Sequence, residues 1–180
     1  CIFSWLLVLT QIVFGGLTVI LQLHNKVVAT HLALGTGFFA TLVWIYSRLQ
    51  LDEAQLIPSA LPKGPTFLSE IGRYRAAALF VLAAVYGQII LGGLVASNYA
   101  ANVCPDFPYC HGELVPTLQG VIGLQVIHRL GAYTLFVIVS VFSFYVIKTA
   151  KVVRVRRKAL LAFSFLALQI FVGISNVLLQ

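Results

Sequence analysis

The chain has 180 residues, of which 60% are hydrophobic and 9% are charged, and its mean hydropathy is +0.97. This balance excludes an ordinary soluble domain, in which about a quarter of the residues carry a charge. The net charge of +7 is better explained by charged loops beside apolar segments than by a nucleic-acid surface, so we expect membrane lipid as a partner and no nucleic acid.

Five apolar segments follow one another, and each is long enough to cross a hydrocarbon core of about 30 Å as a helix. They are residues 2–23, 27–49, 76–97, 118–147 and 159–179. Backbone groups in lipid must be hydrogen-bonded within their own segment, which only helices achieve at these lengths. The first segment lacks the basic start and the cleavage site of a signal peptide. The sequence therefore predicts an all-α, polytopic membrane helical bundle with five transmembrane helices.

Basic residues fix the orientation of this bundle, because they accumulate in cytoplasmic loops. The loop after the second segment carries Arg48, Lys63, Arg73 and Arg75, and the loop after the fourth carries Lys148, Lys151, Arg154, Arg156, Arg157 and Lys158. We place both loops in the cytoplasm and residues 24–26 and 98–117 outside. The expected location is the plasma membrane of a bacterium or archaeon rather than the mitochondrial inner membrane.

A Gln-Ile-x-x-Gly pattern occurs in three of the segments, starting at Gln11, Gln88 and Gln169. Glycines and amides are common where membrane helices pack, but three copies in phase favour a tandem repeat of helix pairs. The first copy continues into a helix with a histidine, so we expect the second to continue likewise after Gln180, in a helix cut from this chain.

The repeat divides the chain into parts of two helical halves. Residues 1–49 form the end of an N-terminal half with two transmembrane helices, and residues 50–75 form a cytoplasmic linker. Residues 76–180 form a C-terminal half with three transmembrane helices and the outer loop 98–117.

Two histidines, His31 and His128, lie in the outer parts of apolar segments. An ionisable residue in a membrane has a partner or a ligand by default, and a hydrogen bond to a neighbouring helix explains a single buried histidine equally well. Gly35 follows His31, and Gly131 and Ala132 follow His128, at helical spacing. Each ring thus projects beside little bulk, where a flat macrocycle could enter, and imidazole is the usual axial ligand of haem iron. The pattern favours haem binding in the outer half of the membrane.

Two further polar residues accompany His128. Arg129 follows it directly, and two interpretations of this arginine stay open: snorkelling to lipid headgroups and pairing with a haem propionate. Gln125 precedes His128 by three residues and shares its helical face. We expect its amide to face the same ligand.

The outer loop contains Cys104 and Cys110 in a turn-rich segment on the oxidising side. A structural disulfide is the expected state. A metal site with His111 lacks a fourth ligand, and a redox-active pair has closer spacing as a rule, so both are less favoured. Asp106 and Glu113 are expected to be solvated loop residues, as is His111.

Three stretches together resemble the C-terminal half of haem A synthase: residues 88–97, the cysteine loop 104–110, and Gln125-Val-Ile-His128-Arg129. The resemblance covers the whole chain. It implies two similar four-helix halves, eight helices in all, of which this chain matches helices three to seven.

The resemblance implies an oxidoreductase that oxidises the C8 methyl group of haem O to a formyl group, making haem A for terminal oxidases. It implies a haem B cofactor in the C-terminal half, with His128 as the first axial ligand and the second on an eighth helix. It implies the substrate haem O in the other half, with His31 as its second ligand to the haem iron. Implied partners are haem O synthase, an electron donor and a second copy of the protein.

One position departs from the family. The N-terminal half of the family has a glutamate, with a catalytic role, three residues before its first histidine, whereas Gln125 stands at the equivalent position here. A neutral amide cannot act as a carboxylate base, so the resemblance implies that no catalytic residue lies in this fragment and that the fragment alone is inactive.

Two other functions stay open from the residues themselves. Paired histidines show only redox capacity, so a b-type membrane cytochrome that carries electrons is one alternative. A membrane thiol oxidoreductase that uses Cys104 and Cys110 is the other.

Overall fold

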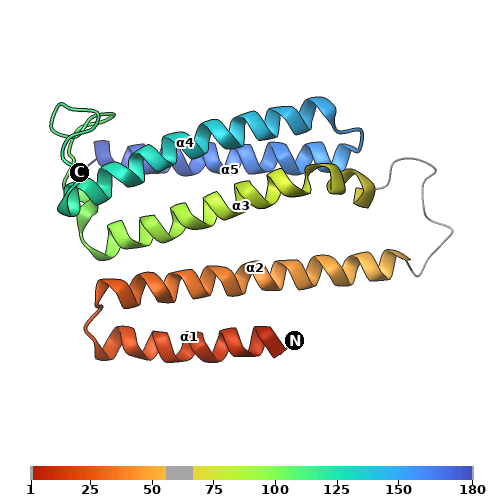
Figure 1. Ribbon diagram of the computed structural model, residues 1–180, viewed down its shortest axis with the longest axis horizontal. Coiled ribbons are helices and arrows are strands. Elements are labelled where there is room, and N and C mark those ends of the chain that lie inside the picture. Colours follow the sequence, from red (N-terminus) through yellow and green to blue (C-terminus); the bar gives the residue numbers. More distant parts are fainter. Residues whose placement is uncertain (1, 56–66, 180) are drawn as a thin grey trace. The chain divides into compact units, whose positions relative to one another are not determined.

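The computed structural model describes residues 2–55 and 67–179, and this part of the chain is helical without strands. The helices are α1 (Ile2–Ile20), α2 (Asn25–Gln55), α3 (Phe67–Ser97), α4 (Gly120–Thr149) and α5 (Val153–Leu178), with a short 3-10 turn, η2 (Ala100–Asn102), after α3 (Figure 1). Each of the five long helices contains a stretch that is long and apolar enough to span a membrane. The predicted all-α membrane fold with five transmembrane helices is confirmed.

The helices are longer on the predicted cytoplasmic side than the apolar segments suggest. α2 continues past residue 49 to Gln55, and α3 begins at Phe67 instead of residue 76. A segment defined by hydropathy ends at the first charged residues. Arg, Lys and Glu are good helix formers, however, so the helix continues beyond the hydrocarbon. The predicted linker 50–75 therefore holds two helix ends, and its middle, 56–66, lies outside the described residues.

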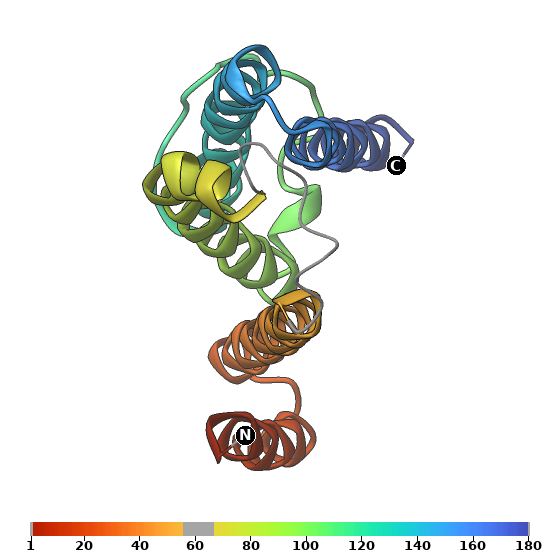
Figure 2. The ribbon, with the colours of Figure 1, turned by 90° about the vertical axis from the view of Figure 1, so that its right-hand side faces the viewer.

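The chain divides into two compact units, Cys1–Gly64 and Pro65–Gln180. In the first, α1 and α2 form an antiparallel hairpin, and the turn between them holds Gln22 and Leu23 at positive φ. In the second, α4 packs against both α3 and α5 (Figures 1 and 2). The predicted outer loop connects α3 to α4 within this second unit.

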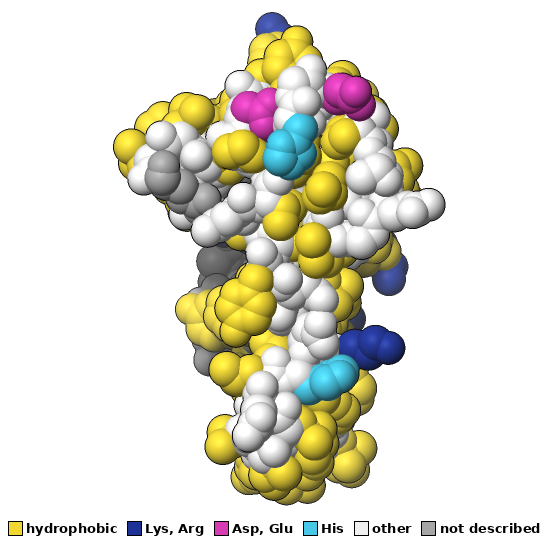
Figure 3. All heavy atoms as spheres, turned by 90° about the vertical axis from the view of Figure 1, so that its left-hand side faces the viewer, with side chains coloured by type: hydrophobic (Ala, Val, Ile, Leu, Met, Phe, Trp, Pro, Cys, Tyr) yellow, Lys and Arg dark blue, Asp and Glu magenta, His cyan; other side chains and the backbone are white. Residues whose placement is uncertain are grey.

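The surfaces of the helices are largely apolar. In α1, no described residue is buried, and in α5 the rings of Phe165 and Phe171 are 68% and 67% exposed. Figure 3 looks at the end that carries the outer loop, where acidic and histidine side chains of the second unit stand among hydrophobic ones. Such surfaces are stable in hydrocarbon rather than in water, as expected of a multi-pass membrane protein.

A buried carboxylate joins α3 to the turn between α4 and α5. Glu70 accepts hydrogen bonds from the backbone N–H groups of Lys151 (2.5 Å) and Val152 (2.6 Å). One turn further along α3, the hydroxyls of Tyr74 and Thr149 are hydrogen-bonded at 2.9 Å. These contacts fix the adjoining ends of α3, α4 and α5. There, outside the hydrocarbon, a charged side chain costs less free energy.

We predict that Glu70→Ala lowers the Tm of the protein in detergent, because two buried backbone N–H groups lose their acceptor. Glu113→Ala is the matched control, since this glutamate lies exposed in the outer loop and only its backbone forms hydrogen bonds. Thermal denaturation followed by circular dichroism measures both. An equal Tm for the two variants would contradict the role assigned to Glu70.

Candidate functional site

In the first unit, the ring of His31 lies directly against α1. A methyl group at Gly15 would approach Cε1 of His31 to 3.2 Å. Four residues after His31 on α2 and four residues before Gly15 on α1, the contact is reversed: a methyl group at Gly35 would overlap the amide nitrogen of Gln11. Each helix thus offers a glycine to the polar side chain of the other, which allows the two backbones to approach closely.

The second unit repeats this arrangement between α3 and α4. A methyl group at Gly92 would lie 3.1 Å from Cε1 of His128, and one at Gly131 would overlap Oε1 of Gln88. The Gln and the first Gly of each unit belong to the sequence repeat. We call this set of Gln, Gly, His and Gly the glutamine–histidine motif of each unit.

The motif corrects one expectation about space. The glycines after the histidines were expected to leave room for a macrocycle, but Gly35 and Gly131 receive the amides of Gln11 and Gln88. The spacing along one helix identifies small residues without showing which side chain of the neighbouring helix fills the gap. A macrocycle must therefore approach the imidazole from a side that neither the glycine nor the glutamine covers.

The polar contacts differ between the units. In the second, Nε2 of Gln88 lies 3.1 Å from Nδ1 of His128 and donates to the backbone carbonyl of His128 at 2.8 Å. In the first, Oε1 of Gln11 and Nδ1 of His31 are both buried and have no hydrogen-bond partner among the described residues. The ring of His128 therefore directs Nδ1 toward Gln88 of the neighbouring helix. Sequence reasoning used these glutamines only as markers of the repeat.

Gln125 is turned toward the outer loop. Its Nε2 donates to the carbonyl of Ala101 in η2 at 3.3 Å, although its side chain shares a helical face with His128. The amide nitrogen is thus engaged by the loop, whereas the buried Oε1 has no hydrogen-bond partner among the described residues. That Gln125 faces the same ligand as His128 stays a prediction.

Arg129 is 9% exposed and holds the outer loop. Its Nη1 donates to the carbonyls of Asp106 (2.7 Å) and Tyr109 (2.6 Å), and its Nη2 donates to the carbonyl of Cys104 (2.7 Å). A side chain that snorkelled to headgroups would point to water instead. Anchoring of the loop is a role that the sequence did not suggest, since the acceptors are backbone atoms.

A disulfide joins Cys104 to Cys110 within this loop, and both residues are buried against Val126 of α4. Among the described residues no group of three or more histidine, cysteine, aspartate or glutamate side chains could hold a metal ion. The structure thus agrees with the disulfide and leaves His111 without metal-binding companions.

Asp106 organises the turn that follows the disulfide loop. Its two carboxylate oxygens accept hydrogen bonds from the backbone N–H groups of His111 and Gly112, each at 2.8 Å. These N–H donors, that of Gly112 first, hold the pKa of the Asp106 carboxyl below its usual value. The expectation of a merely solvated aspartate is therefore wrong.

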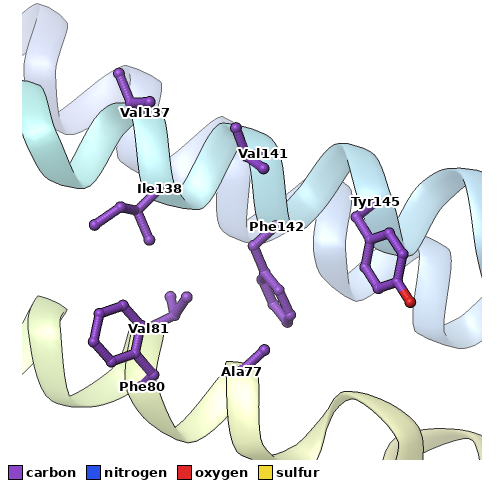
Figure 4. Close-up of a pocket in the computed structure, with 8 residues that line it drawn as sticks. All are labelled: Ala77, Phe80, Val81, Val137, Ile138, Val141, Phe142 and Tyr145. Carbon is purple, nitrogen blue, oxygen red and sulfur yellow. The ribbon is translucent and has the colours of Figure 1, made fainter.

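A hollow of about 390 Å³ lies between α3 and α4, away from the motif of the second unit (Figure 4). Its walls are apolar side chains such as Phe80, Ile138 and Phe142, with one hydroxyl from Tyr145. Ile138 stands about 15 Å along α4 from His128, at 1.5 Å per residue. Apart from the Tyr145 hydroxyl the lining is apolar and contains no histidine, so the glutamine–histidine motifs remain the candidate site.

Comparison with known families decides the relationship of this chain. A model of the COX15-CtaA family, described as cytochrome oxidase assembly protein, matches residues 1–180. The chain belongs to this family. The resemblance seen in the sequence is thereby confirmed.

Several bacterial proteins named haem A synthase are similar to this chain. One from Rhizobium etli is 29% identical over 180 residues, covering 93% of the chain and 46% of the relative. One from Shewanella oneidensis is 28% identical over 202 residues, covering 99% of the chain and 57% of the relative. The chain thus spans about half the length of these curated relatives. No solved structure matches it.

The comparisons correct the expected cofactor of this family member. The relatives are named for haem A, and neither the family description nor the geometry indicates haem B. His31 and His128 each lie against a glycine of the neighbouring helix. No contact in the structure assigns His128 a different macrocycle from that of His31. The expectation of a haem B cofactor is therefore wrong. The comparisons do not favour an electron-carrying b-type cytochrome or a thiol oxidoreductase either.

We predict that Arg129→Ala loosens the outer loop by roughly 3 kcal/mol, because three carbonyls lose a charged donor. Arg129→Lys should restore only part of this, since a single ammonium cannot reproduce the planar fork. The rate at which a water-soluble phosphine reduces the Cys104–Cys110 disulfide in the purified protein reports the change. Equal rates in wild type and Arg129→Ala would show that the arginine does not hold the loop.

We predict that acid opens the same loop through Asp106. The folded carboxyl has a lowered pKa, so its stabilisation is present above the unfolded value of about 3.9 and is lost as the pH falls through the folded value. Phosphine reduction should accelerate below about pH 4 in the wild type. In the Asp106→Asn variant, phosphine should reduce the disulfide faster at neutral pH than in the wild type, and acid should accelerate the reduction less. A variant with the same pH profile as the wild type would refute the assignment.

Proposed function

We propose that this chain is the haem-binding part of a haem A synthase, an oxidoreductase that oxidises the C8 methyl group of haem O to a formyl group. The observation that carries the proposal is the repeated glutamine–histidine motif in a membrane protein of the COX15-CtaA family. The substrate haem O and the product haem A match the name of the relatives.

In this proposal His31 and His128 each bind the iron of a haem of the O or A type. The residues fit such a ligand, because both imidazoles are partly buried and that of His128 directs Nδ1 toward Gln88, which leaves Nε2 for the metal. Among the described residues Nε2 of His128 has no hydrogen-bond partner. Helical bundles commonly hold haem through histidines on their helices.

Arg129 contributes beside His128. The guanidinium has five N–H groups, and the outer loop uses three of them. We assign the remaining two, on Nε and Nη2, to a haem propionate, for which a guanidinium is well suited.

Conversion of a methyl to a formyl group adds one oxygen atom and removes electrons, so an electron acceptor or oxygen chemistry is required. A bound haem iron supplies redox chemistry of this class. The residues of this chain hold and orient the macrocycle, and the apolar helices exclude water from it. Gln125 cannot accept a proton as a carboxylate can, so the catalytic base is not at this position. Haem O synthase and an electron donor are proposed partners, in a bacterial plasma membrane.

We predict that His128→Ala and His31→Ala each lower the haem O bound by the purified protein by about one half, because each removes the axial ligand of one site. His24→Ala and His111→Ala are matched controls, since His24 is exposed in the turn between α1 and α2 and His111 is exposed in the outer loop. Titration with haem O in detergent, followed by absorption spectra, measures the stoichiometry.

The same titration can refute the proposal. Unchanged binding in the double variant of His31 and His128 would show that the histidines are not haem ligands. Retention of a normal Tm by the single variants, measured in parallel, excludes unfolding as the cause of lost binding.

A further inference from the structure

We propose that Gln88 and Gln11 are positioning residues that select Nε2 of the neighbouring histidine as the iron ligand and accept a hydrogen bond from Nδ1–H once iron is bound. This inference rests on the proposed function, because it requires His128 and His31 to bind haem iron. It goes beyond that function by assigning a role to two glutamines that do not touch the macrocycle.

The second unit shows how the glutamine holds the ring. Nε2 of Gln88 is near both Nδ1 and the backbone carbonyl of His128, at 3.1 and 2.8 Å. Carbonyl oxygen only accepts hydrogen bonds, so the amide nitrogen of Gln88 is the atom that faces His128. Nδ1 then accepts the second N–H of the amide, and the ring proton resides on Nε2.

Iron binding changes this pattern. Coordination through Nε2 requires its lone pair, so the ring proton must move to Nδ1. Nδ1 becomes a donor and can no longer face an amide N–H group. Rotation of the Gln88 amide exchanges its two ends and brings Oε1 to Nδ1. Oε1 now lies over Gly131, where a methyl group would overlap it, so only a glycine leaves room for the turning amide.

The first unit provides an independent observation. Oε1 of Gln11 and Nδ1 of His31 are both buried and lack a hydrogen-bond partner in the described part of the chain. They are an acceptor and a potential donor in the same motif that pairs Gln88 with His128. A proton on Nδ1 would turn it into a donor, the kind of partner that Oε1 of Gln11 lacks. Buried polar atoms without a partner are rare enough to call for an explanation, and a hydrogen bond made only in the ligand-bound state provides one.

A hydrogen bond from Nδ1–H to an acceptor has a chemical effect on the metal. It fixes the ring orientation and raises the basicity of Nε2, which strengthens the bond to iron. The glutamines would thus adjust the haem iron from outside its coordination shell. A neutral amide gives a moderate effect, whereas a carboxylate in the same place would give a larger one.

The test uses resonance Raman spectroscopy of ferrous haem O bound to the full chain. In a His31→Ala background, the iron–histidine stretching band reports His128 alone. Gln88→Leu should shift the band to lower frequency, since the acceptor is lost, and Gln88→Glu should shift it to higher frequency. Gln125→Leu is the matched control, because it removes a buried amide of α4 that binds Ala101 rather than the ring, and it should leave the band in place.

The outcomes separate this inference from the proposed function. Absence of an iron–histidine band in the His31→Ala background itself would refute haem ligation by His128. A band that stays at the same frequency in both Gln88 variants would overturn the role of Gln88 while haem binding stands. In haem-free protein, 15N spectra of labelled histidine provide a second readout: the proton of His128 should reside on Nε2 in wild type and redistribute in Gln88→Leu. An Nδ1–H ring in the wild type would also overturn the inference.

Discussion

Close approach of two helices at a glycine is the contact on which both candidate sites depend. Gly15 and Gly92 have no side chain, so the rings of His31 and His128 can lie against the neighbouring helix. In lipid no hydrophobic force holds helices together, and association depends on such close packing and on hydrogen bonds between helices. The same contact therefore stabilises each helix pair and sets the direction in which its imidazole points.

Hydropathy alone predicted the number of helices and their class, because a lipid environment requires about twenty apolar residues for each span. It did not predict where α2 and α3 end. The first turns of α3 contain Glu70, which a hydropathy count assigns to a loop, yet its carboxylate is needed inside the fold to accept two N–H groups of the α4–α5 turn. Helix ends depend on partners that a local pattern does not contain.

The sequence predicted only those site residues whose type is unusual for their surroundings. His31 and His128 stood out because an ionisable side chain in an apolar segment is costly. Gln88 appeared only as part of a repeat, and Arg129 appeared as a candidate for a ligand. Their observed partners are a ring nitrogen and three loop carbonyls, and such pairings depend on helix rotation and loop path, which the sequence does not specify.

Polar contacts at two depths determine the position of α4 in the second unit. In its outer half, Arg129 joins it to the disulfide loop through backbone carbonyls, and the adjacent His128 joins it to Gln88 of α3. At its inner end, Glu70 fixes the turn that follows it. Between these two depths, the hollow between α3 and α4 is lined by apolar side chains apart from Tyr145, and such contacts specify rotation less strictly than directed hydrogen bonds do. A ring that must present Nε2 to a planar ligand requires a defined rotation of its helix. The hydrogen bonds on both sides of His128 supply this constraint, which apolar packing in lipid would leave weak.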